Sequence, residues 1–170
     1  MRCMRQARRN GFTLIELVIT LALVGLITMT ALPMYGVVST RLKESELRAA
    51  LRSLRGAMDA YKAVWDSGQI PHKDGESGYP PSLEVLVQGV EVGIKDATTL
   101  TGEAATRRVV FLRQVPRDPF HTDASVPAAQ TWRTRAYGSS TDDPQSGADV
   151  FDVASMSARV GLNGVPYGQW

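Results

Sequence analysis

The chain has 170 residues, with 19 Lys and Arg against 17 Asp and Glu, and a single cysteine. This length fits one compact domain with at most one further element, which argues against a large multidomain enzyme. One cysteine excludes an internal disulfide framework and any zinc or iron–sulfur site that needs several cysteines. A hydrophobic fraction of 44% with 21% charged residues argues against bulk disorder.

The N-terminus joins a basic segment to a long apolar one. Residues 1–11 hold four arginines and no acidic residue, and the apolar stretch Phe12–Val38 contains one charge, Glu16. Leu17–Val38 is an uncharged run of 22 residues, and a helix needs about 20 to cross a bilayer core. The positive-inside rule keeps the arginines in the cytoplasm and places the rest of the chain across the membrane. Hydropathy alone leaves a plain signal anchor for a periplasmic domain equally open.

Glu16 is the unusual residue of this stretch. A carboxylate in hydrocarbon costs about 2.5–3.5 kcal/mol on insertion scales, so it usually has a partner. No Lys, Arg or His lies between Phe12 and Thr40. Cleavage after Gly11 would give Phe12 a charged amino group within helical reach of Glu16, in the same chain or a neighbouring one. Solvation of Glu16 by lipid headgroups is the alternative, and spacing does not choose between them.

The residues around Glu16 form a specific motif, RNGFTLIEL at Arg9–Leu17. It resembles the processing motif of type IV prepilins and of the pseudopilins of type II secretion. The resemblance implies that a membrane aspartic prepilin peptidase cuts between Gly11 and Phe12, and that Phe12 is then N-methylated. It also implies that Glu16 helps new subunits dock by pairing with the N-terminal amine of a subunit already in the filament. Asn10 departs from the basic or small residue that often precedes this glycine.

The helix is predicted to continue beyond the membrane as an amphipathic segment. Apolar residues recur every three or four positions and so share one face: Leu47, Leu51, Leu54, Met58, Tyr61 and Trp65. A solvated face is predicted from the charged residues between them: Arg41, Lys43, Glu44, Glu46, Arg48, Arg52, Arg55 and Lys62. Gly68 and Pro71 supply stop signals, so one helix from Phe12 to Asp66 is expected, about 80 Å long.

Gly25 and Pro33 fall inside the apolar half of this helix. Both weaken a helix, and Pro33 also removes one backbone hydrogen bond. Such residues are common in membrane helices, which is one explanation for them. The resemblance to pilins implies another, that the helix extends locally between Gly25 and Pro33 in an assembled filament.

The rest of the chain predicts a small α+β head. Ser82 is a candidate N-cap for a short helix that Gly89 ends. The segment 93–106 is rich in Gly, Thr and Ala and predicts a loop, and the prolines of 115–120 exclude regular structure. Alternation over 132–137 and again over 149–155 predicts an antiparallel hairpin. The expected fold is therefore a long N-terminal helix, transmembrane and then amphipathic, packed against a small antiparallel β-sheet head of the type IV pilin kind.

Pieces of the head resemble a narrower group, the G-type major pseudopilins of type II secretion. These pieces are the segments 79–83, 111–113, 116–120, 151–155 and 161–164, together with Trp170. The resemblance implies a structural subunit that polymerises into a periplasmic pseudopilus. A type IV pilin or minor pilin for adhesion, motility or DNA uptake is the first alternative, and a monomeric membrane-tethered periplasmic binding module is the second.

This resemblance also sets the expected organisation and partners. Residues 1–11 would be the leader peptide, 12–38 the membrane and filament-core half of the helix, and 39–170 a periplasmic head. The chain would cross the bacterial inner membrane once, with its N-terminus in the cytoplasm, before joining a periplasmic filament. Its partners would be the prepilin peptidase, copies of itself, other pseudopilins, and an inner-membrane assembly platform with its ATPase.

Members of this group often hold calcium near the C-terminus through several Asp residues, but the segment 156–170 contains no Asp or Glu. Because calcium takes 6–8 oxygen ligands with carboxylates prominent among them, a family-type calcium site is doubtful and no cofactor is expected. His72 and His121 are isolated, and no nucleophile elbow surrounds Ser155, so no enzyme activity is predicted. Basic residues are interspersed with acids, so no nucleic-acid partner is expected.

Cleavage would also change the composition of the chain. The leader holds four of the 19 basic residues and none of the 17 acidic ones, so the mature chain would carry 15 against 17, formally −2. It also holds Cys3, the only cysteine. A mature chain without cysteine has no C-terminal disulfide loop of the kind that many major type IV pilins carry, which favours the pseudopilin interpretation.

Overall fold

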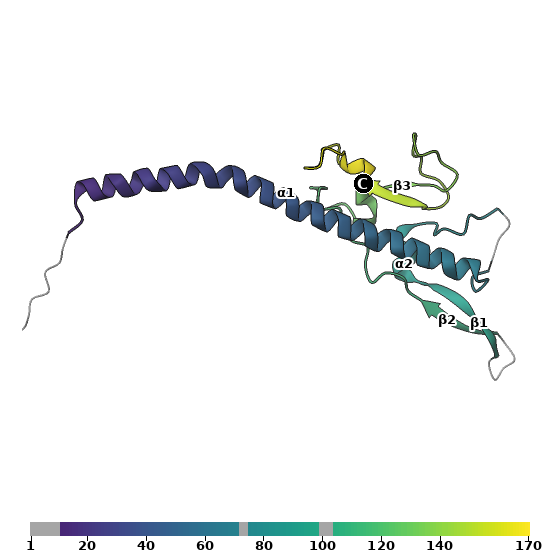
Figure 1. Ribbon diagram of the computed structural model, residues 1–170. Helices are drawn as coiled ribbons and strands as arrows, with labels where there is room; N and C mark the ends of the chain where they lie inside the picture. Colours follow the sequence, from purple (N-terminus) through teal and green to yellow (C-terminus); the bar gives the residue numbers. More distant parts are fainter. Residues whose placement is uncertain (1–10, 72–74, 99–103) are drawn as a thin grey trace, which may run out of the picture. The chain divides into compact units, whose positions relative to one another are not determined.

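A computed structural model describes residues 11–71, 75–98 and 104–170. The chain divides into two compact units that meet between Thr40 and Arg41, and each is considered by itself. The helix α1, Leu14–Asp66, contributes to both (Figure 1). The leader residues 1–10, including Cys3, lie outside the described residues.

In the first unit, α1 begins two residues later than predicted because Thr13 caps it. The Thr13 hydroxyl accepts the Glu16 N–H at 3.3 Å and the Thr13 carbonyl accepts the Leu17 N–H at 3.2 Å, which satisfies two of the free donors at the helix start. Helical geometry then continues without a break through Gly25 and Pro33. The side chain of Pro33 lies outside the described residues.

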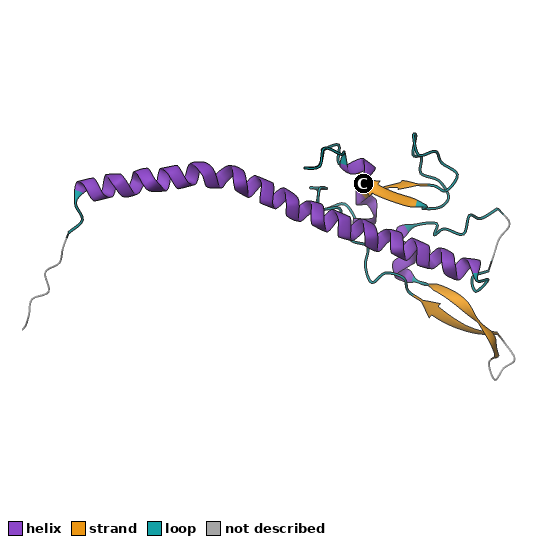
Figure 2. Ribbon diagram, in the orientation of Figure 1, coloured by secondary structure: helices purple, strands orange, loops and turns teal. Residues whose placement is uncertain are grey.

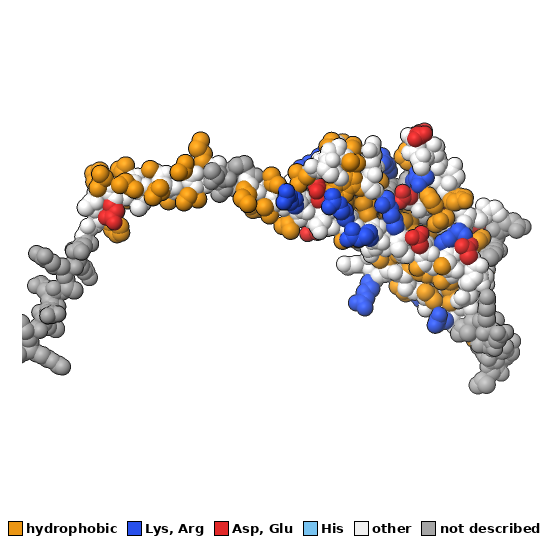
Figure 3. Space-filling model, in the orientation of Figure 1, with side chains coloured by type: hydrophobic (Ala, Val, Ile, Leu, Met, Phe, Trp, Pro, Cys, Tyr) orange, Lys and Arg blue, Asp and Glu red, His pale blue; other side chains and the backbone are white. Residues whose placement is uncertain are grey.

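Large hydrophobic side chains cover this part of α1 and are exposed (Figure 3). Leu14 is 80% exposed and Leu26 is 64% exposed. By length and composition, α1 is able to cross a membrane. The predicted apolar half of the helix is therefore present as a helix, and its hydrophobic side chains are exposed along its length.

In the second unit, α1 buries the predicted apolar stripe, defined here as Leu47, Leu51, Leu54, Met58 and Tyr61. All five side chains are at most 7% exposed. Trp65, the next residue in phase, is half-buried and lies against Gly78, where the backbone has a φ of +82°. A Cβ at Gly78 would lie 2.6 Å from the Trp65 ring, so only glycine fits beneath the indole.

The rest of the second unit consists of short elements beside α1 (Figure 2). The helix α2, Leu83–Gln88, follows Ser82 as predicted, although the Ser82 side chain makes no cap hydrogen bond, and Gly89 ends it with a φ of 76°. The strands β3, Trp132–Arg135, and β4, Asp152–Ser155, pair antiparallel, which confirms the predicted hairpin at a shorter length. Two 3₁₀ turns complete the unit: η1, Ala128–Thr131, and η2, Tyr167–Gln169.

The segment 93–106, predicted as a loop, instead belongs largely to a second antiparallel hairpin. The strand β1, Val90–Thr98, pairs with β2, Ala104–Val109, and Val92 opposite Arg107 lies within the regular register. The prediction was wrong because backbone pairing, anchored by the Gly93 N–H on the Gln69 carbonyl at 2.9 Å, overrides the low strand preference of Gly and Ala here.

One core joins the stripe to the β3–β4 sheet. Trp132 and Val153, from opposite strands, are 2% and 1% exposed and pack with α2 residues Leu83 and Leu86 and with the stripe. The fold is thus α+β, with a long apolar N-terminal helix and small antiparallel sheets, as the sequence predicted.

Replacing a stripe residue tests this core. Leu54→Ala removes a side chain that is 0% exposed and should lower the free energy of unfolding by about 2–5 kcal/mol through lost burial and the cavity left behind. The measurement is urea unfolding of the full chain in detergent, followed by tryptophan fluorescence. Leu42→Ala is the matched control on the same helix, since Leu42 is 62% exposed, and should change stability by less than about 0.5 kcal/mol.

Candidate functional site

The predicted processing site lies at the open start of α1. Gly11 and Phe12 precede the helix, and Phe12 is 82% exposed, so the Gly11–Phe12 bond lies in irregular backbone that a peptidase can reach. Asn10, on the other side of Gly11, lies outside the described residues. Cleavage here and methylation of Phe12 remain predictions.

Glu16 lies in the first turn of α1 with its side chain exposed. No basic side chain among residues 11–71, 75–98 and 104–170 pairs with it. The unpaired N–H groups of the first turn favour a negative charge at this end of the helix. Glu16 is therefore exposed at a helix end that favours a carboxylate, and its role in docking remains a prediction.

A second polar site, in the head, was missed by the sequence analysis. Glu44 was placed on the solvated face of α1, but its side chain is buried at 4% exposure. Its Oε1 accepts the Leu162 N–H at 2.7 Å and the Tyr167 hydroxyl at 3.0 Å, while Oε2 lies 3.9 Å from the Arg48 guanidinium. The signal was available, since Glu44 lies three residues before Leu47 and so continues the phase of the apolar stripe.

Tyr167 is the partner of Glu44 from the end of the chain. It is 0% exposed, and its ring stacks on Phe120 with centroids 4.0 Å apart. Burial, and then the hydrogen bond to Glu44 and its charge, raise the pKa of Tyr167 above the usual value of about 10. The hydroxyl therefore stays protonated and continues to donate to Glu44 over the whole physiological range.

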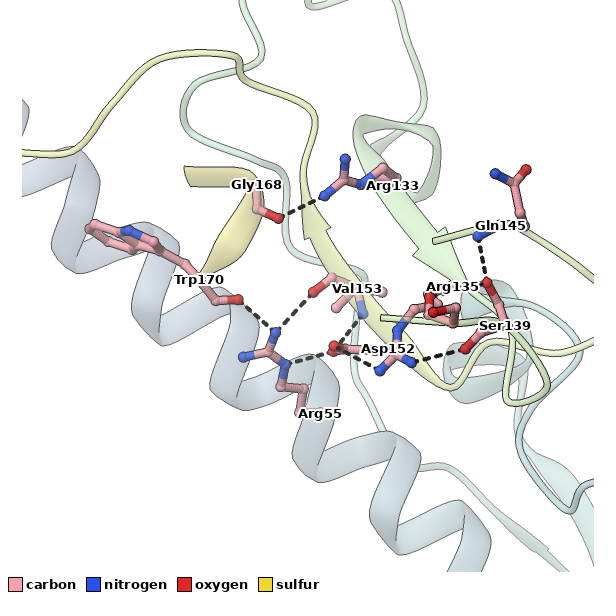
Figure 4. Close-up of polar contacts among 10 residues, drawn as sticks. Arg55, Arg133, Arg135, Ser139, Gln145, Asp152, Val153, Gly168 and Trp170 are labelled. Carbon is pink, nitrogen blue, oxygen red and sulfur yellow. Dashed lines mark hydrogen bonds and ion pairs between the residues drawn. The ribbon is translucent and has the colours of Figure 1, made fainter. Parts of the chain in front are cut away.

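Arg55 holds the C-terminal part of the chain at a second point (Figure 4). Its guanidinium donates to Asp152 Oδ1 at 2.8 Å, to the Val153 carbonyl at 3.2 Å and to the Trp170 carbonyl at 2.7 Å. Arg133 on β3 donates to the Gly168 carbonyl at 2.7 Å. Side chains from α1 and β3 therefore hold the C-terminal segment, residues 156–170, at several points along its length.

A cavity of about 830 Å³ lies beside these contacts and is bordered by Arg55, Arg133 and Arg135. Asp152 lies among the three arginines, 2.8 Å from Arg55 and 3.7 Å from Arg135. Its carboxylate partly neutralises the cavity wall. The arginine contacts beside the cavity hold the segment 156–170 to the sheet, and the residues that line the cavity include no activated nucleophile.

Ser155, His121 and Asp118 are the residue types of a catalytic triad, but the structure does not arrange them as one. The Ser155 hydroxyl does donate to Asp118 Oδ2 at 2.5 Å, but both residues are 1% exposed and out of reach of a substrate. The buried Nε2 of His121 has no hydrogen-bond partner in the described part of the chain, so it takes no proton from Ser155. His72 lies outside the described residues.

Few carboxylates are available to a calcium ion in the described part of the head. Within the described ranges no group of three or more His, Cys, Asp or Glu side chains is placed to hold a metal ion. The segment 156–170 has no carboxylate of its own, and Glu44 already accepts hydrogen bonds from an N–H and an O–H group. Donor hydrogens that point at a carboxylate oxygen occupy the position a cation would need.

Glu44→Gln should loosen the C-terminal segment. The amide keeps the shape of Glu44 but loses a charged acceptor of two hydrogen bonds, which should lower the free energy of unfolding by about 1–3 kcal/mol. The measurement is thermal unfolding together with hydrogen exchange of the Leu162 amide. Glu46→Gln, at an exposed position two residues on, is the control. Equal exchange in the two variants would contradict the role assigned to Glu44.

Comparison with known proteins finds a match for the N-terminal segment. Residues 6–32 match the family described as the prokaryotic N-terminal methylation motif. The chain is also 34% identical over 95 residues to a fimbrial protein of Neisseria meningitidis serogroup A, an alignment that covers 53% of this chain and 55% of that protein. The chain thus spans about half the length of this curated relative, and no solved structure matches it. In its motif and its fold, the chain is similar to type IV prepilins.

Proposed function

We propose that this protein is a structural subunit of a membrane-anchored filament that polymerises through its N-terminal helix. The observation that carries the proposal is the first part of α1, where exposed hydrophobic side chains surround a single carboxylate within a methylation motif. In water such a surface would be unstable, whereas lipid before assembly and other subunits after it would both cover it.

Glu16 would set the register of assembly. Among the described residues it has no cationic partner, and a carboxylate in an apolar surrounding gains most from pairing with a charge. Cleavage after Gly11 creates that charge at the amine of Phe12. An incoming subunit would then stop where its Glu16 meets the amine of a neighbour, because every other position leaves the carboxylate unpaired.

The finer proposal is a pseudopilin of type II secretion. It is supported by the head segments that resemble G-type pseudopilins and by the position of the only cysteine in the leader. The fimbrial relative supports the alternative, a type IV pilin, equally well. Prepilin peptidase, other copies of the chain and an inner-membrane assembly platform with an ATPase would be its partners in either case, and the role is structural rather than enzymatic.

Glu16→Ala separates processing from assembly. The variant should still be cleaved, because the Gly11–Phe12 bond is unchanged, but filaments should fall at least about tenfold, the equivalent of about 1.4 kcal/mol for each docking event. The measurement is the mass of the mature chain together with the yield of sheared or cross-linked filaments from cells.

Two controls make this result specific. Thr20→Ala, one turn further along the same exposed helix, should assemble normally, and Gly11→Val should block cleavage itself. Normal filament yield from Glu16→Ala would sink the pairing role of Glu16. An uncleaved wild-type chain, or one that stays monomeric in the membrane, would sink the proposed function as a whole.

We further propose that the head holds its C-terminal segment without calcium. Glu44, Arg55 and Arg133 supply direct contacts to Leu162, Trp170 and Gly168, the region where related subunits are expected to carry the ion. Millimolar calcium should shift the melting temperature of the full chain by less than about 1 °C, since an ion that does not bind the folded state adds no stability. A calcium-dependent rise of several degrees that EDTA reverses would overturn this proposal.

A further inference from the structure

A second, smaller hollow lies on the head beside the apolar stripe. It has a volume of about 290 Å³, and its wall includes three arginines from α1, Arg48, Arg52 and Arg55, together with Asn163 and Trp170. We call this hollow the basic groove. Basic side chains gather along this part of the helix in Figure 3. No carboxylate lines the groove, so its charge is positive.

The three arginines differ in how much of their charge is already used. Arg55 is fixed by Asp152 and two carbonyls, and Arg48 lies over the Trp170 ring at 4.3 Å and near Glu44. Arg52 is exposed and has no ion pair or hydrogen bond within the described part of the chain. The groove therefore presents one free guanidinium between two that are held in place, an arrangement that suits a carboxylate.

The chain carries a surface of the opposite charge at the turn between β3 and β4. Asp142 and Asp143 are both exposed and are the only adjacent acidic pair in the sequence. Neither carboxylate forms an ion pair in the part of the chain that the structure describes, although Asp142 lies at the wall of the larger cavity that Arg55, Arg133 and Arg135 border. We call this pair the acidic turn.

The acidic turn is held to the sheet rather than free. The Gln145 amide donates to Asp143 Oδ1 at 2.7 Å, and the backbone N–H of Gln145 donates to the Ser139 hydroxyl at 2.7 Å. The Ala136 N–H donates to the Gln145 carbonyl at 2.9 Å. The Asp143 carboxylate is therefore presented with little conformational entropy left to lose on binding, and Asp142 lies beside it on the same turn.

We propose that the acidic turn of one copy binds the basic groove of the next, which adds a head-to-head contact to the contact between helices. The inference rests on the proposed function, because it needs copies that assemble. Groove and turn are different patches, so the contact is heterologous, and a heterologous contact that does not close builds an open filament. The groove is also at the small end of ligand pockets, about 300–1,000 Å³, and presents one free cation rather than the row that nucleic acid requires.

Charge reversal in the full chain, expressed in membranes, tests the contact. Arg52→Glu alone, and Asp142→Lys with Asp143→Lys, should each lower cross-linked multimers at least about fivefold, since one exposed pair is lost and a repulsion replaces it. Combining all three substitutions should restore multimers to within about twofold of wild type. Lys43→Glu and Glu84→Lys reverse exposed charges outside both patches and should leave the yield unchanged.

Cysteine cross-linking tests directly whether the acidic turn of one copy lies next to the basic groove of another. In a Cys3→Ser background, one tagged copy with Arg52→Cys and another with Asp142→Cys should form a mixed dimer on mild oxidation, and a Lys43→Cys copy should not. The contact would be overturned if Arg52→Glu keeps the wild-type yield of multimers, or if the combined variant does not recover that yield. Either result would leave the proposed function standing. The contact would also be overturned if the charge reversals weaken binding of the chain to DNA or to anionic vesicles but leave the yield of multimers unchanged. A wild-type chain that stays monomeric would overturn both.

Discussion

The apolar stripe of α1 is the constraint on which the rest of the head depends. The other elements are too small to make a core by themselves, since α2 has six residues and each sheet has two strands. A two-stranded sheet is marginal in water unless it packs on another element. Leu47, Leu54 and Met58 supply that surface, and Trp132 and Val153 from the sheet meet it. The head is therefore organised around one face of one helix.

The parts that could be predicted from the sequence are those with a clear period. The three-and-four spacing from Leu47 to Trp65 fixed the helix and its buried face, and Gly68 marked its end to within two residues. Alternation around Trp132 and Val153 located the β3–β4 hairpin. The motif at Gly11–Glu16 was equally easy to identify, because this order of residues occurs at few other kinds of N-terminus.

The missed features lack such a period or contradict it. In β1 and β2 the strand pairing relies on backbone hydrogen bonds, with Gly93 and Arg107 in places where a hydrophobic alternation would have given a signal. Glu44 was missed for the opposite reason. Its charged side chain was expected in solvent, although its position lies on the same face of the helix as the buried stripe. Its partners, Leu162 and Tyr167, lie more than 100 residues away, so no local pattern shows that a buried carboxylate is satisfied there.

Buried polar contacts of this kind determine position more than they add stability. Taking the Glu44 carboxylate out of water costs free energy that its two hydrogen bonds largely offset, and a hydrophobic residue would contribute as much to the core. A hydrophobic residue, however, would accept the segment 156–170 in many arrangements, whereas Glu44 accepts only one that brings the Leu162 N–H and the Tyr167 hydroxyl to it together. Arg55 adds the same requirement at Trp170. The proposed filament role would need that single arrangement, because neighbouring subunits would contact the head and the filament would repeat any misplacement.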